Sequence, residues 1–304
     1  MELPRRSGLL LHVTSLPGGP YTGDLGRSAY AFADFLAEAG QAYWQTLPLN
    51  PIGDGSSPYS TIGSFATEPL MVSPELLVED GLLGRDSLEG LPARSEGWTA
   101  DFASSEAVRS RLLREAYRAF VADRAAWADA VSEFRERERA WLDDYCLFAA
   151  FQAHFGTGDW TTWPGEIVGH EPDALIAARE RLDEQIDYLI FEQFLFDRQW
   201  SALKRYCNDK GIGLIGDVPM FVSHQSADVW AHQNTFLLRD DGYPEFVAGA
   251  PPDAFAHDGQ RWGNALYDWE VHERTGFAWW IERIRRQLEL FLSLIHISEP
   301  TRRH

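Results

Sequence analysis

Apolar residues are concentrated in three short runs, each bounded by glycine or proline. The runs cover residues 8–17, 42–51 and 212–222. Short apolar runs with such borders are typical of buried strands. The sequence therefore predicts three buried strands, widely spaced along the chain.

A helical pattern separates the first two predicted strands. From about Ser28, the apolar residues Phe32, Phe35, Leu36 and Ala39 recur at the spacing of one helical face, and Gly40 is a natural stop. A strand, a helix and a second strand in this order form a unit whose two strands run parallel. We therefore expect an α/β fold with a parallel sheet.

The segment 74–172 shows helical periodicity and no alternation typical of strands. One helix is predicted at 105–122, with Val108, Leu112, Ala116 and Phe120 on one face, and another at about 127–155. This segment is interpreted as a helical insertion between the second and third strands.

Two more helices complete the pattern. A long helix at about 182–209 is expected to direct Trp200, Leu203 and Cys207 inward and to stop at Gly211. A last amphipathic helix is predicted at about 269–291. Three strands cannot close a barrel, so either the fold is small or the chain is cut short.

Composition describes a globular chain of 304 residues with 45% hydrophobic and 13% aromatic residues. No apolar run reaches the roughly 18 residues of a membrane span, and the N-terminus lacks a clear signal-peptide cleavage region. A cytoplasmic protein with no membrane partner is expected. Cys146 and Cys207 give neither a disulfide framework nor metal-ligand spacing, so both are predicted to be reduced core residues.

The formal net charge of -19 argues against a nucleic-acid partner, since a polyanion would be repelled. A neutral substrate is compatible with such an acidic surface.

The most informative run is 211–269. Its apolar strand leads into Asp217, and a long loop rich in proline, aspartate, aromatics and amides follows. Catalytic barrels place their sites where strands end. Carboxylates and amides bind sugar hydroxyls, while a flat indole covers the C–H face of the ring. On composition alone, a structural loop with a buried tryptophan explains this run equally well.

Five segments, in this order, resemble the amylomaltase family, also called 4-α-glucanotransferase or disproportionating enzyme. They read LLLHVTSLPGGPYTGDLG, AGQAYWQTLPLNP, GDGSSPYSTIGSFATEPL, IGDVPMFVSHQSADVW and GAPPDAFAHDGQRWGNALYDW. The resemblance covers about residues 8–291.

The resemblance implies a (β/α)8 barrel, present here as an incomplete barrel of its first three strands. It divides the chain into a first barrel part (1–73), a helical insertion subdomain (74–172), a continuation of the barrel (173–291) and a tail (292–304). It also implies transfer of α-1,4-glucan segments to the 4-hydroxyl of an acceptor glucan with retention, without metal or organic cofactor. Retention requires two carboxyl groups about 5 to 5.5 Å apart.

By the same resemblance, eight residues bind substrate: Ser57, Tyr59, Asp217, Asp253, Phe255, Trp262, Gly263 and Asn264. Ser57 and Tyr59 are expected on the donor side, Asp217 in the cleaved subsite, and Trp262 to Asn264 on the acceptor side. Four of these residues have a structural alternative: a tight turn at Ser57 and Tyr59, a helix cap or a partner for a backbone amide at Asp217, and a core position for Trp262. His12 is interpreted as a structural histidine.

The family's three catalytic carboxylates are expected downstream of Phe291, where an Arg-x-Asp-His motif carries the nucleophile. That motif does not occur in the 304 residues. Residues 292–302 (LSLIHISEPTR) resemble the translation of a sequencing-library adapter, so the tail is interpreted as foreign. The chain as written is therefore expected to be inactive and poorly soluble, with an open sheet edge.

Two other functions remain open. One is a related α-retaining glucan hydrolase or phosphorylase, in which water or phosphate is the acceptor. The other is a glucan-binding fragment that retains part of the cleft without chemistry.

Overall fold

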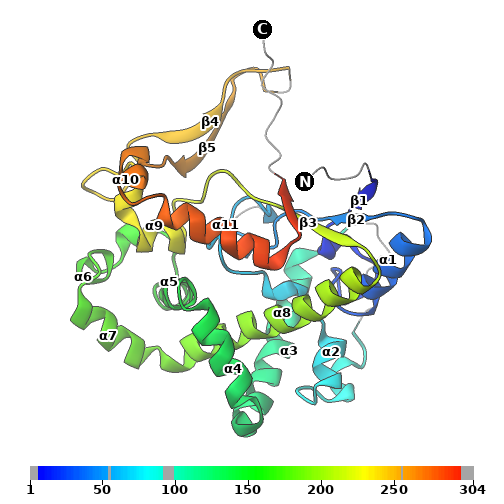
Figure 1. Ribbon diagram of the computed structural model, residues 1–304. Coiled ribbons are helices and arrows are strands. Elements are labelled where there is room, and N and C mark those ends of the chain that lie inside the picture. The colour runs from blue at the N-terminus through cyan, green and yellow to red at the C-terminus, as the bar shows by residue number, and fades with distance from the viewer. Residues whose placement is uncertain (1–5, 54–55, 92–98, 255, 296–304) are drawn as a thin grey trace.

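The computed structural model describes residues 6–53, 56–91, 99–254 and 256–295. Its parallel sheet has four strands in the order β1-β2-β3-β6 (Figure 1). These strands are β1 (Gly8–Leu10), β2 (Tyr43–Gln45), β3 (Gly213–Asp217) and β6 (Ser293–Ile295). Every neighbouring pair runs parallel, which confirms the predicted α/β fold with a parallel sheet.

Helices make up most of the remaining structure, and α8 crosses the middle of the molecule with the sheet on one side and α3 and α4 on the other (Figure 1). The helices are α1 (Arg27–Glu38), α2 (Pro74–Glu79), α3 (Phe102–Ala122), α4 (Arg124–Glu138), α5 (Leu142–Phe155), α6 (Gly165–Val168), α7 (Pro172–Arg181), α8 (Asp183–Asp209), α9 (Ala227–Ala231), α10 (Trp269–Arg274) and α11 (Ala278–Leu290).

The long helix α8 confirms its prediction closely. Trp200, Leu203 and Cys207 are buried, and Gly211 ends the turn after the helix with a φ of +75°. Gln193 and Gln199 on the same helix bind the backbone of Thr67 and Ser73 through paired amide hydrogen bonds of 2.7–3.2 Å. Because buried polar groups need partners, these amides fix the segment after β2 onto α8.

The first two strands are shorter than predicted. The expected buried strand at 8–17 was wrong in both length and burial, since β1 has three residues and Leu9 and Leu10 are 40% and 50% exposed. His12 then caps a short 3-10 turn, Val13–Ser15, by accepting from the backbone of Thr14. β2 likewise covers only part of 42–51.

Helix α1 begins and ends where expected, but its buried face differs. Ala29, Ala33 and Leu36 are fully buried, whereas Phe35 is 53% exposed. Small alanines at this spacing let the helix approach its neighbours closely, and the large Phe35 is turned outward. The assignment of Phe35 to the core face was wrong.

A fourth strand extends the sheet beyond the predicted three. β6 pairs with β3, with Ser293 opposite Ile215, and the backbone N–H of Leu292 donates to Leu214. The buried Phe291 ring lies so close to Gly216 that a Cβ there would collide with it. The count of three strands was therefore too low. The foreign origin of residues 292–304 stays a prediction, and 296–304 lie outside the described residues.

The described residues of 74–172 form helices and contain no strand, as the periodicity predicted. The single helix expected at 127–155 is instead two, α4 and α5. Glu138 at the end of α4 accepts from the Trp141 indole (2.8 Å) and from Arg286 (3.1 Å), which anchors the turn between the two helices. Helices α3, α4 and α5 all pack on α8. The interpretation of 74–172 as a separate subdomain stays a prediction.

The last predicted helix, 269–291, also divides in two, as α10 and α11. Gly276 and Phe277 have φ values of +64° and +56°, a left-handed pair that ends α10.

Before α10 in the chain, an antiparallel hairpin of β4 (Val247–Ala250) and β5 (Gln260–Ala265) projects from the molecule (Figure 1). This hairpin was not predicted, because its residues lack the alternation typical of strands.

The two cysteines are buried and unpaired with each other, as predicted. Burial raises the pKa of the Cys207 thiol to about 12. No helix in the described parts of the chain has the length and apolar character needed to cross a membrane.

Candidate functional site

The candidate site centres on a hydrogen bond between residues far apart in sequence. Asp217 is the last residue of β3, and the Tyr59 hydroxyl donates to its Oδ2 at 2.7 Å. Asp217 is 1% exposed, whereas Tyr59 is 38% exposed. The structure thus brings two predicted site residues together at the carboxyl end of a parallel strand, where α/β folds bind ligands.

The second oxygen of Asp217, Oδ1, is buried and has no hydrogen-bond partner among the described residues. A buried carboxylate oxygen without a donor is costly, so it favours any hydroxyl that can reach it. Burial and the adjacent Asp217 carboxylate raise the pKa of Tyr59 above its usual value. Tyr59 therefore acts as a donor to Asp217 at neutral pH, and its half-exposed ring remains available for contact.

Ser57 lies in the turn that presents Tyr59. Its Oγ accepts from the backbone of Tyr59 at 3.3 Å, and its carbonyl accepts from Ser60 at 3.1 Å. The tight turn expected from this sequence is present. Ser57 is only half-buried, so a role in shaping the turn and a role in contacting a ligand are compatible.

The loop that carries Ser57 and Tyr59 is anchored by Glu68, which the sequence analysis missed. Its two oxygens accept from the backbones of Ile52 (2.7 Å) and Leu70 (2.9 Å). Burial raises the pKa of Glu68 to about 7, although these two bonds act in the opposite direction. The signal was a glutamate directly before Pro69, which opens a short 3-10 helix that Glu68 caps.

The segment that follows Asp217 is held by Arg283 on α11, a second residue that was missed. Arg283 is 1% exposed and donates to the carbonyls of Pro219 (2.7 Å) and Met220 (3.5 Å). The sequence feature that could have identified Arg283 is its position at the apolar spacing of Trp279 and Leu290, on the helix face predicted to be buried. A cation on a core face needs acceptors, and here they are the backbone carbonyls beside the site.

The hairpin carries the predicted acceptor-side residues. Trp262 is 51% exposed, so the core alternative is wrong, and its indole donates to Gln260 at 2.9 Å. Gly263 has a φ of +80°, and a Cβ there would meet open space. The Asn264 amide donates to the carbonyl of Val222 at 2.9 Å, which ties the hairpin to the segment after β3.

The loop between β4 and β5 contains the remaining predicted residues. The Asp253 carboxylate accepts from the backbone of Ala256 at 2.7 Å, which closes the loop locally. Phe255 lies outside the described residues. No described contact places this loop directly against Tyr59 or Asp217.

The predicted residues therefore form two groups. Ser57, Tyr59 and Asp217 gather at the end of β3, whereas Asp253, Trp262, Gly263 and Asn264 lie on the hairpin. They are linked by residues 218–222, through Asn264 and through the ring of Phe221 at 6.3 Å from that of Trp262.

His12 has the structural role expected of it. Its ring nitrogens bond the Thr14 hydroxyl (2.7 Å) and the Pro48 carbonyl (3.2 Å), and burial lowers the pKa of His12 to about 4. Within the described ranges, no group of three or more acidic, histidine or cysteine side chains is arranged to hold a metal ion.

Comparison with known proteins identifies the family. The 4-alpha-glucanotransferase family matches residues 11–295. The chain belongs to this family. The resemblance inferred from the five sequence segments is thereby confirmed.

Curated relatives agree over nearly the whole chain. A 4-alpha-glucanotransferase of Thermus thermophilus is 45% identical over 292 residues, which cover 96% of this chain and 57% of the relative. One from Synechocystis is 42% identical and covers 97% of this chain and 58% of the relative. The chain thus spans somewhat more than half the length of these relatives.

Solved structures show the same fold. The amylomaltase from Streptococcus agalactiae, in complex with acarbose, matches with a TM-score of 0.91 and 37% identity, covering 96% of this chain and 59% of that one. The amylomaltase from Corynebacterium glutamicum, at 20% identity and a TM-score of 0.72 over 96% of this chain and 40% of that one, supports the fold alone.

Proposed function

We propose that this chain forms the glucan-binding part of a 4-α-glucanotransferase, which transfers α-1,4-glucan segments to the 4-hydroxyl of an acceptor glucan with retention. The four parallel strands would then be one part of a (β/α)8 barrel. We also propose a cytoplasmic location, and a neutral glucan substrate agrees with the acidic charge. No metal or organic cofactor is required for this chemistry.

The observation that carries the proposal is the Tyr59–Asp217 pair. It lies at a strand end, it has no cationic partner within the described structure, and it leaves the Asp217 Oδ1 without a donor. A sugar hydroxyl supplies such a donor, and the exposed Tyr59 ring offers a face for the sugar C–H groups. Trp262 on the hairpin adds a second exposed aromatic surface.

Titration calorimetry with acarbose and maltotriose tests the binding role. We expect Asp217→Asn to weaken binding by roughly tenfold, because the charged acceptor for the sugar hydroxyl is lost, and Tyr59→Phe to weaken it similarly, because Asp217 loses the bond that holds it in place. The matched control is Tyr206→Phe, which removes a Tyr–Asp hydrogen bond of 2.8 Å to Asp34 outside both the strand-end site and the groove described below. If all three variants bind the same glucan equally well, the strand-end pair is not the glucan site.

Product analysis distinguishes the related reactions. A transferase converts maltotriose to glucose and longer chains, a hydrolase releases reducing ends only, and a phosphorylase requires phosphate. We propose that the 304 residues bind glucan without catalysing disproportionation, since the family's nucleophile motif is not among them. Conversion of maltotriose to longer chains by the purified 304-residue chain would overturn this second proposal and leave the binding proposal standing.

A further inference from the structure

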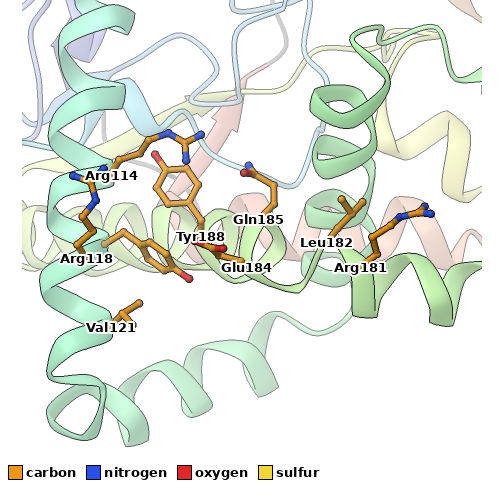
Figure 2. Close-up of a pocket in the computed structure, with 9 residues that line it drawn as sticks. Arg114, Arg118, Val121, Arg181, Leu182, Glu184, Gln185 and Tyr188 are labelled. Atoms are coloured by element: carbon orange, nitrogen blue, oxygen red, sulfur yellow. The ribbon is translucent and has the colours of Figure 1, made fainter.

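A groove far from the strand-end site lies between α3 and the junction of α7 and α8. Its volume is about 540 Å³ (Figure 2). Nine residues line it: Arg114, Tyr117, Arg118, Val121, Arg181, Leu182, Glu184, Gln185 and Tyr188. It lies in the helical insertion and its contact with α8, and the glucan proposal above assigns it no role.

Two arginines give the groove its charge. Arg114 and Arg118 are four residues apart on α3, so they share one face of the helix. Both are exposed, and neither forms an ion pair within the described structure, whereas Arg111 on the same helix pairs with Glu115 at 3.7 Å. Two guanidinium groups on one helix face without an ion-pair partner in the described structure are a local exception on a chain of net charge -19, and they favour an anion.

The floor of the groove is aromatic. The Arg114 guanidinium lies 4.6 Å from the centre of the Tyr188 ring and forms a cation–π contact with it. Tyr117 lies beside it, and its hydroxyl donates to Asp187 at 2.7 Å. Asp187 is also paired with Arg124, so its charge is already compensated.

The opposite side of the groove is polar. Figure 2 shows Glu184 and Gln185 on α8 between the Arg114 side and Leu182, while Arg181 directs its guanidinium away from Arg114 and Arg118. The groove therefore has a cationic end at α3 and a neutral-to-acidic end at α8. Carboxylate and amide groups at that second end suit sugar hydroxyls and disfavour a second phosphate.

We propose that this groove binds a hexose phosphate, with the phosphate on Arg114 and Arg118 and the sugar against Tyr188, Glu184 and Gln185. Guanidinium groups bind phosphate oxygens through paired, charge-assisted hydrogen bonds. The aromatic surface and the polar far end bind the sugar ring. The volume of the groove accommodates a molecule of this size.

Calorimetric titration of the 304-residue chain with glucose 6-phosphate, glucose and inorganic phosphate tests the proposal. We expect glucose 6-phosphate to bind at least about tenfold more tightly than either half, and its affinity to fall with added salt. Arg114→Gln and Arg118→Gln should each weaken it by roughly tenfold. Arg111→Gln is the matched control, because it makes the same change on the same helix outside the groove, and it should leave the affinity within about twofold.

Tyr59→Phe separates this site from the glucan site, since it should leave glucose 6-phosphate binding unchanged. Thermal unfolding of each variant verifies that the fold is retained. Absence of glucose 6-phosphate binding, equal affinity for inorganic phosphate, or equal loss in the Arg111→Gln control would each overturn the proposal.

Discussion

Two tyrosine–aspartate hydrogen bonds of the same length allow a comparison between two regions of the described structure. Tyr59–Asp217 lies at the end of β3, and Tyr117–Asp187 joins α3 to α8, each at 2.7 Å. Arg124 also binds Asp187, whereas Asp217 has no cationic partner within the described structure and keeps one oxygen without a donor. The Tyr117–Asp187 pair is therefore completed by its surroundings, whereas the Tyr59–Asp217 pair is not.

This difference indicates which pair is structural and which is a candidate for ligand binding. Burial opposes ionisation of Asp187, but the bonds from Arg124 and Tyr117 outweigh it and lower the pKa of this carboxyl. A carboxylate that already has its cation gains little from a ligand. A buried carboxylate without one gains a full hydrogen bond, which is why perturbed or incomplete polar groups concentrate at functional sites.

The largest effect on the free energy of unfolding is expected from replacing Arg283, which supports the backbone beside Asp217. Arg283→Met should lower the free energy of unfolding by about 3 kcal/mol, because the carbonyls of Pro219 and Met220 lose a buried donor. Urea denaturation measures the change. Arg285→Met on the same helix removes only an exposed pair with Glu282 and should have little effect. Equal losses in the two variants would contradict a special role for Arg283.

A second prediction contrasts the two regions by pH. The folded-state pKa of Glu68 is about 7, above the unfolded value of 4.5, so the unfolded chain releases this proton first as pH rises. The contribution of Glu68 to the free energy of unfolding is complete below pH 4.5 and is lost as pH rises towards 7, with a magnitude of the order of 3 kcal/mol. Asp187 behaves oppositely, because its pKa is lowered from 3.8 and its contribution is lost only as pH falls below that value.

Urea titrations at pH 5 and pH 8 test the pH contrast. Glu68→Gln should reduce the difference in unfolding free energy between these two pH values. Glu192, whose pKa burial also raises to about 7, contributes a second part of the slope, so the variant should not abolish it. Asp187→Asn should leave the slope between pH 5 and pH 8 unchanged, and a steeper slope in Glu68→Gln would refute the assignment.

A third prediction concerns the two aspartates directly, and the expected signs are opposite. Asp217→Asn should raise the free energy of unfolding by about 1 kcal/mol, because it removes a buried charge without a cation. Asp187→Asn should lower it by about 1 kcal/mol, because Arg124 loses its partner. Thermal or urea unfolding of the two variants side by side decides this, and loss of stability in both would mean that both pairs are structural.

The smallest effect on stability is expected at Trp262. Its side chain is 51% exposed and its hydrogen-bond partner Gln260 is two residues away, so Trp262→Ala should change stability by less than about 0.5 kcal/mol. A stability loss above 2 kcal/mol would instead indicate a packing role. Maltotriose titration of the same variant measures whether the exposed indole contributes to glucan affinity.

Much of the fold followed from local patterns. The spacing of Trp200, Leu203 and Cys207 was sufficient to predict α8 and its buried face, because a long amphipathic repeat has one dominant solution. Shorter or less periodic segments failed. The helix expected at 127–155 is divided in two, and Glu138 at the end of the first part bonds Arg286, about 150 residues further along, a partner that local periodicity does not reveal. The β4–β5 hairpin has exposed residues on both faces, so no alternation marked it.

The candidate site, like the fold, could be predicted from the sequence only in part. Asp217 was predictable because a carboxylate after an apolar strand has few structural uses. Glu68 and Arg283 were not singled out, because their importance comes from backbone groups that become neighbours only on folding. Single charged residues in a sequence do not reveal whether their partners are solvent or buried carbonyls.

By itself, the sequence determined the family, the parallel sheet, the helical nature of 74–172 and the identity of the strand-end residues, since these depend on residue type and local spacing. Only the tertiary structure decided that Tyr59 bonds Asp217, that Arg283 supports the next turn and that Arg114 and Arg118 face an open groove. Those facts depend on distances between segments up to 158 positions apart, which packing and buried hydrogen bonds fix and local periodicity does not.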